Sequence, residues 1–142
     1  MSLYTQDFNY WCKCQSALLR SGRFDGLDLQ NLAKEIEDMG NQQEWELFNR
    51  LTQLILHLLK CKYQSSQITK SWKNSIVFQR DDIEYLVKKN PSLKPVLEQS
   101  IEDAYKRARK LFEPETGISV KKIPVENVFT VQEILDSSWF PE

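Results

Sequence analysis

Apolar residues in the segment 41–63 recur at the spacing of a helix that is covered on most of its circumference. At about 100° per residue, its large apolar side chains share an arc of roughly 200°. These residues are Trp45, Leu47, Phe48, Leu51, Leu54, Ile55, Leu56, Leu58 and Leu59. A helix that lies on one flat surface needs only about half that width. We therefore predict a central third helix, packed between neighbours on two or three sides.

The rest of the chain carries further amphipathic patterns, separated by glycine, proline or capping residues. The expected helices cover residues 6–21, 29–39, 41–63, 70–89 and 93–112, followed by a short helix from 131 to about 136. No segment shows a convincing strand alternation, so the predicted fold class is all-α. We expect one compact bundle of about five amphipathic helices plus a short C-terminal helix, as a single domain over residues 1–142.

Short polar residues mark where these helices should begin. The expected N-caps are Thr5, Asp28, Asn41, Ser92 and Thr130. Glu44 and Glu133 stand three residues after two of these caps, which is the spacing of a capping box. Gly40 should end the second helix and Pro114 the fifth.

Composition excludes several functional classes without selecting one. The chain has 142 residues, a net charge of -1 and 27% charged residues, so it has no overall attraction to nucleic acid or to an anionic membrane. Its N-terminal sequence lacks the pattern of a signal peptide, and no apolar run approaches the ~20 residues that span a bilayer. Three cysteines suit reduced thiols better than a disulfide framework. We expect a cytoplasmic protein with no membrane partner.

Five segments together carry a family resemblance. They are YTQDFNYW, LLRSGRFDGLDLQNLAKEIEDMG, LILHLLKCKYQ, SWKNSIVFQRDDIEYLVKKNPSLKP and FTVQEILDSSWFP. In this order and spacing the chain resembles the bacterial, largely cyanobacterial, family catalogued as domain of unknown function 29. The resemblance implies a compact all-α fold, a bacterial cytoplasmic setting and no established activity. Its polar positions correspond to Glu35, Glu37, His57, Lys60, Trp72 and Gln79, and the resemblance assigns none of them a catalytic role.

A polar cluster of Glu35, His57, Lys60 and Gln79 is the first candidate site. Gln79 falls within an apolar stripe and should have a partner, since an unpaired buried amide costs about 1–3 kcal/mol. Glu35 flanks a stripe expected to be buried and, if it met His57, would raise the pKa of the imidazole and fix its tautomer. A base held by a carboxylate is the beginning of an acid–base site. The favoured alternative is a structural hydrogen-bond network with His57 in solvent.

Metal binding has weaker support. His57 and Cys61 share a helix face, but His57 is the single histidine of the chain, whereas closed zinc sites take four nitrogen or sulfur ligands. Cys12 and Cys14 are two residues apart and point away from each other on a helix. The sequence also lacks a glycine-rich phosphate loop and the common hydrolase and zinc motifs. We expect no metal and no cofactor.

Nucleic-acid binding would depend on a basic segment of the fifth predicted helix. Its cations spread over about 160° of the helix and alternate with acidic residues, as on an ordinary solvated face. These cations are Lys106, Arg107, Arg109 and Lys110. The pattern therefore disfavours a nucleic-acid partner.

An aromatic row is the last candidate. Phe78 and Tyr85 lie on one side of the fourth predicted helix, and Trp139 and Phe140 close the chain. The first expectation is that the C-terminal segment covers the row and makes it core. If the row stays uncovered, it would form an apolar patch for a partner or a second copy.

Three functional hypotheses follow. The leading one is a small helical interaction or regulatory module that acts through a protein partner or self-association. The second is a helical enzyme with His57 as base, oriented by Glu35, with Lys60 or Arg50 binding an anion; we regard an enzyme as the weaker hypothesis. The third is a weak nucleic-acid-binding module. The sequence gives no indication of a small-molecule ligand.

Overall fold

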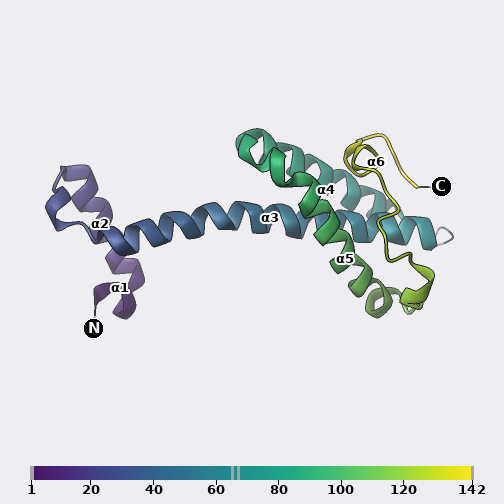
Figure 1. Ribbon diagram of the computed structural model, residues 1–142, viewed down its shortest axis with the longest axis horizontal. Helices are drawn as coiled ribbons and strands as arrows, with labels where there is room; N and C mark the ends of the chain where they lie inside the picture. Colours follow the sequence, from purple (N-terminus) through teal and green to yellow (C-terminus); the bar gives the residue numbers. More distant parts are fainter. Residues whose placement is uncertain (1, 65, 67, 142) are drawn as a thin grey trace. The chain divides into compact units, whose positions relative to one another are not determined.

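The computed structural model describes residues 2–64, 66 and 68–141, and every element of regular structure in this part is helical (Figure 1). The α-helices are α1 (Leu3–Gln6), α2 (Phe8–Ser21), α3 (Leu29–Tyr63), α4 (Lys70–Lys89), α5 (Leu97–Thr116) and α6 (Val131–Leu135). Short 3-10 turns, η1 (Phe24–Gly26), η3 (Pro91–Val96) and η4 (Val120–Lys122), stand between them. The predicted all-α class is confirmed.

Residues 29–63 form one helix, α3, where the sequence predicted two. The predicted break at Gly40 is wrong, and so is the capping box expected at Asn41 and Glu44, because all three residues lie inside the helix. A glycine inside a helix costs only about 1 kcal/mol relative to alanine. No proline follows it to remove a helix hydrogen bond. Glycine alone was therefore too weak a stop signal.

The first long helix begins later than predicted. Asp7 caps α2, since its side chain accepts a hydrogen bond from the backbone N–H of Tyr10 at 3.0 Å. The expected cap, Thr5, lies instead within the short helix α1. The predicted C-terminal end is confirmed, because Gly22 adopts the left-handed conformation that follows Ser21.

The later helices agree more closely with the sequence patterns. α4 covers the predicted range 70–89 and is capped by Thr69. α6 opens with the predicted capping box of Thr130 and Glu133. α5, however, starts only after the 3-10 turn η3, so Ser92 is not its cap. It also continues past Pro114 to end before Gly117, whose φ of 75° suits a glycine.

Contacts along the chain divide it into two compact units, Met1–Gln42 and Gln43–Glu142. The first unit contains α1, α2 and the N-terminal part of α3. Among its described residues only Trp11 and Gln15 are buried. It therefore has very little core of its own.

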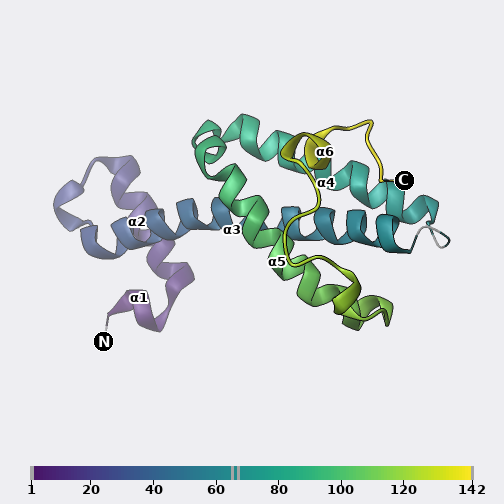
Figure 2. The ribbon, with the colours of Figure 1, turned by 45° about the vertical axis from the view of Figure 1, so that its right-hand side comes forward.

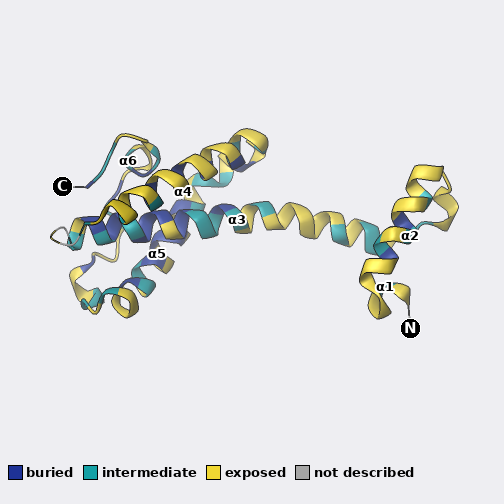
Figure 3. Ribbon diagram, turned by 180° about the vertical axis from the view of Figure 1, so that it is seen from behind, coloured by how far each residue is buried: buried dark blue, intermediate teal, exposed yellow. Residues whose placement is uncertain are grey.

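The second unit packs α4, α5 and the C-terminal segment around the C-terminal part of α3 (Figures 2 and 3). Seven α3 side chains have no exposed surface: Leu47, Leu51, Leu54, Ile55, Leu56, Leu58 and Leu59. The expected central position of this part of α3 is thus confirmed. The expected burial of Trp45 is wrong, because this residue is 58% exposed; its ring is tilted against that of Phe48, with the centres 5.4 Å apart.

Candidate functional site

The residues of the expected acid–base pair take separate partners. Glu35, in the first unit, accepts a hydrogen bond from the hydroxyl of Tyr4. His57, in the second unit, has its Nδ1 atom 2.8 Å from the backbone oxygen of Gln53, one turn earlier in α3. The hydrogen bonds of the described residues therefore do not join the imidazole to the carboxylate that was expected to orient it.

Lys60 and Gln79 are also engaged differently from the expected cluster. Lys60 forms an ion pair with Glu115 and lies 5.9 Å from the centre of the Trp72 ring. The side-chain oxygen of Gln79 is buried, and no hydrogen-bond partner for it lies among the described residues. The partner expected for this amide oxygen is not seen. Nothing in these contacts gathers the four polar residues around one reacting position.

The metal candidate gains no support from its surroundings. Among the residues that the structure describes, no group of three His, Cys, Asp or Glu side chains could hold a metal ion. Cys61 is buried, which raises the pKa of its thiol.

Among the described residues, no helix combines the length and apolar character needed to cross a membrane.

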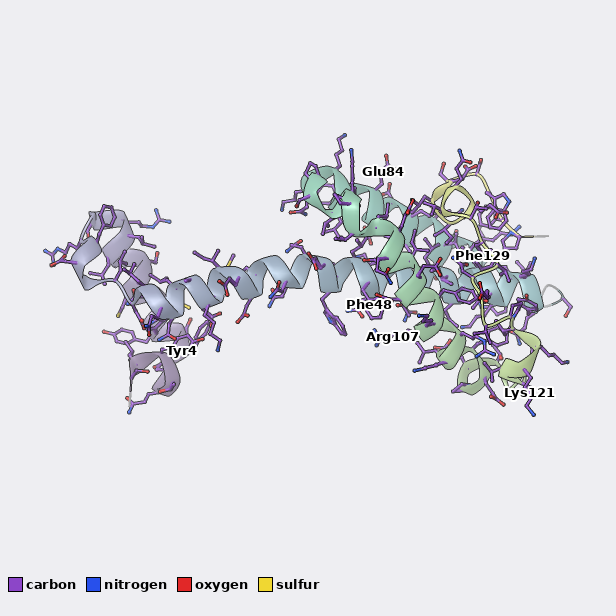
Figure 4. All side chains as sticks on the ribbon, in the orientation of Figure 1. Tyr4, Phe48, Glu84, Arg107, Lys121 and Phe129 are labelled. Atoms are coloured by element: carbon purple, nitrogen blue, oxygen red, sulfur yellow. The ribbon has the colours of Figure 1, made fainter. Side chains whose placement is uncertain are left out.

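Two cations of the basic segment are used for packing. The Arg107 guanidinium lies over the rings of Phe48 and Trp45, 5.3 and 5.8 Å from their centres (Figure 4). Arg109 donates hydrogen bonds to the backbone oxygens of Ile123 and Val120, at 3.0 and 3.2 Å. Two of the four cations of this segment, Arg107 and Arg109, therefore contact neighbouring parts of the same chain.

Arg80 is a buried residue that the sequence analysis missed. Its Nε, Nη1 and Nη2 atoms donate to the backbone oxygens of Ile134, Trp139 and Glu133 at 2.8, 2.7 and 2.9 Å. Two of these carbonyls belong to the last turn of α6, where helix oxygens lack partners within the helix. Burial lowers the pKa of the guanidinium, and the Phe140 ring centre lies 5.5 Å away. Arg80 therefore fastens the C-terminal segment onto α4.

A signal for Arg80 was present in the sequence. Ile76, Arg80 and Ile83 are spaced by four and three residues, so the arginine lies within the buried stripe of α4. A charged residue at such a position requires several hydrogen-bond partners.

A pocket of about 420 Å³ lies beside Arg80. It is lined by Arg80, Ile83, Glu84, Val87, Lys88, Lys94, Leu97 and Leu135.

In the first unit, Asp28 joins α2 to the start of α3. Its carboxylate accepts hydrogen bonds from the Asn31 amide at 2.8 Å and from the Trp11 indole at 3.0 Å. The backbone N–H of Asp28 donates to the side chain of Gln15 at 2.8 Å. The Asn31 hydrogen bond, helped by the Trp11 bond, lowers the pKa of Asp28. Asp28 also accepts from the Asn31 backbone N–H, as the predicted N-cap should.

A tyrosine contact supports the same junction. The hydrogen bond to Glu35 raises the pKa of Tyr4 to about 12. The Tyr4 ring packs edge-on against Phe8 and Trp11, with centres 5.7 and 4.9 Å apart. Hydrogen bonds and one aromatic cluster thus hold together a unit that buries few apolar side chains.

A row of exposed apolar side chains in the first unit lies on α3. Leu29 is 67% exposed, Ile36 is 65% exposed and Met39 is 63% exposed. We use the term N-terminal stripe for Leu29, Ala33, Ile36 and Gly40, which are spaced by four, three and four residues and are all exposed. The expectation that the stripe of segment 29–39 would be buried is wrong.

A second exposed row lies on α4. Phe78 and Tyr85 are each 67% exposed. The expectation that the C-terminal segment covers this row is wrong. Trp139 and Phe140 instead pack beside the core, where the Trp139 ring meets Phe129 edge-on at 5.9 Å. Phe78 and Tyr85 are therefore uncovered, whereas Trp139 and Phe140, which the alternative also placed in the patch, are packed.

Comparison with known proteins gives one match. A family model described as "Domain of unknown function DUF29" matches residues 3–140. Searches of curated proteins and of solved structures found no match.

Proposed function

The chain belongs to the DUF29 family, and from that premise we propose that it is a protein-interaction module whose binding surface is the N-terminal stripe. We place it in the bacterial cytoplasm, the setting implied by the resemblance. In this proposal the second unit is a stable support, and the first unit presents the surface that a protein partner covers.

The exposure of the N-terminal stripe carries this proposal. Leu29 and Ile36 leave about two thirds of their surface in solvent, although both stand at helical spacing on one face of α3. Clusters of exposed apolar side chains on folded proteins typically mark surfaces that bind other proteins. The partner would supply the apolar cover that the first unit lacks.

No specific observation favours an enzyme. His57 is hydrogen-bonded to its own helix, and Glu35 is engaged by Tyr4. The enzyme hypothesis required Glu35 to orient His57 through a hydrogen bond, and no hydrogen bond among the described residues joins them. The interaction hypothesis therefore accounts for more of the structure.

The proposal can be tested by site-specific photo-crosslinking in cells. A photoreactive p-benzoylphenylalanine is introduced at Ile36, in the middle of the stripe, or at Asp38, an exposed control position about 200° around the helix. We expect a discrete crosslinked protein species from position 36 and none from position 38. Equal crosslinking from both positions, or none from position 36, would refute the proposal.

A further inference from the structure

We propose that the partner of the N-terminal stripe is a second copy of this chain, bound in antiparallel orientation. This inference depends on the proposed function, since it names the occupant of the same surface. It follows from the order of large and small residues along the stripe.

The stripe alternates in size. From residue 29 to residue 40 it reads Leu29, Ala33, Ile36, Gly40: large, small, large, small. Spacings of four and three residues place these positions along one seam, as in the heptad pattern of paired helices. A Cβ atom built on Gly40 meets no atom of the described residues within 4 Å, so the seam is open at this point.

An antiparallel copy fits this order against itself. When Ala33 of one chain faces Ile36 of the other, Leu29 of each chain faces Gly40 of its partner. Every layer then pairs one large and one small side chain, so its volume stays nearly constant, as close packing requires. A parallel pair would place Leu29 on Leu29 and Gly40 on Gly40, which crowds one layer and leaves a void in another.

The positions beside the seam agree with the antiparallel arrangement. On one side, Leu32 of each copy would lie near Met39 of the other, which adds apolar contact. On the other side, Gln30 would lie near Glu37, a pair that can hydrogen-bond. In antiparallel pairs these flanking positions set the orientation. This register brings no two like charges together beside the seam.

The first unit has a physical reason to associate. Its length is close to the limit of about 40 residues below which chains usually need an added staple or an oligomer to fold, and it buries only two of its described residues. Pairing of the two N-terminal stripes gives the first units of both copies a shared apolar layer. Because the seam has only four layers, we expect a reversible dimer in the micromolar range, the affinity of small interfaces.

The test is a size-swap experiment on the full chain, with the dimer dissociation constant measured by sedimentation equilibrium. Ala33→Ile places isoleucine against isoleucine in two layers, and we expect the dimer to weaken at least tenfold. The double variant Ala33→Ile/Ile36→Ala exchanges the two sizes and should restore dimerisation to within a few-fold of the wild type. Ala17→Ile, at an exposed position of α2, is the matched control and should leave the constant unchanged.

The outcomes separate this inference from the proposed function. A dimer that Ala33→Ile weakens and the double variant does not restore would overturn the antiparallel register. A wild-type chain that stays monomeric up to hundreds of micromolar, while the photoreactive group at position 36 captures a different protein, would overturn self-association and leave the proposed function standing. Circular dichroism checks that each variant keeps its helices.

Discussion

The two parts of α3 carry similar stripes in different surroundings. In the second unit, Leu54 and Ile55 have no exposed surface because α4, α5 and the C-terminal segment cover them. In the first unit, Leu29 and Ile36 remain about two thirds exposed on the same helix. The comparison teaches that an amphipathic pattern specifies which face of a helix is apolar. It does not specify whether that face is covered within the chain.

Different interactions stabilise the interior of each unit. The second unit depends on apolar burial, with Arg80 as one charged fastener. The first depends on the hydrogen bonds that meet at Asp28 and on the aromatic contacts of Tyr4. Mutations that remove apolar contacts should therefore affect the two units unequally.

The largest effect is expected when two isoleucines of α3 are truncated and the resulting losses in the free energy of unfolding are compared. Ile55→Ala leaves a cavity in the buried core and should lower the free energy of unfolding by about 2–5 kcal/mol. Ile36→Ala removes the same atoms from an exposed position and should change it by less than about 0.5 kcal/mol. Urea unfolding, followed by circular dichroism at a concentration where the chain is monomeric, measures both. Similar losses from the two variants would contradict the comparison.

A smaller effect is expected at the polar junction of the first unit. Asp28→Ala removes the acceptor of the Trp11 and Asn31 hydrogen bonds, so backbone amides of α2 should exchange with solvent several-fold faster. Amides of α4 should be unaffected. Hydrogen exchange followed by mass spectrometry measures both helices. Asp25→Ala, at an exposed aspartate three residues earlier, is the control.

The same junction should depend on pH. The pKa of Asp28 is lowered below its ordinary value of 3.8 in the folded chain, so its stabilising contribution is complete above that value. The contribution is lost as the pH falls through the lowered pKa. The amides of α2 should therefore lose protection in acid below about pH 4 in the wild type. A difference between wild type and Asp28→Ala that persists unchanged in stronger acid would contradict this assignment.

The smallest expected effect concerns the continuity of α3. Gly40→Ala should raise the stability of the helix around residue 40 by about 0.5–1 kcal/mol, because alanine is the better helix former and its Cβ would meet no described atom. Gly117→Ala is the matched control. It should destabilise α5, since Gly117 has a φ of 75° that alanine adopts poorly. Amide exchange around each glycine measures the two effects, and a loss of protection in Gly40→Ala would indicate a helix break.

The accuracy of the sequence predictions depended on how decisive each local signal was. The C-terminal end of α4 was predicted correctly because Asn90 precedes a proline, which disfavours further helix. Gly40 was ambiguous, since glycine weakens a helix without forbidding it. Arg80 was missed although it stood inside an apolar stripe, because its partners are backbone oxygens 53 to 59 residues away. Backbone acceptors leave no mark in the residue pattern.

The sequence by itself determined the all-α class, the apolar faces of the helices and the family of the chain. Those properties depend on local spacing and on residue identity, both of which can be read directly from the sequence. Only the tertiary structure decided which faces are buried, that Glu35 bonds Tyr4 rather than His57, and that the N-terminal stripe faces solvent. Burial and hydrogen bonding depend on which distant segments meet, and each apolar face is compatible with several neighbours, including another chain.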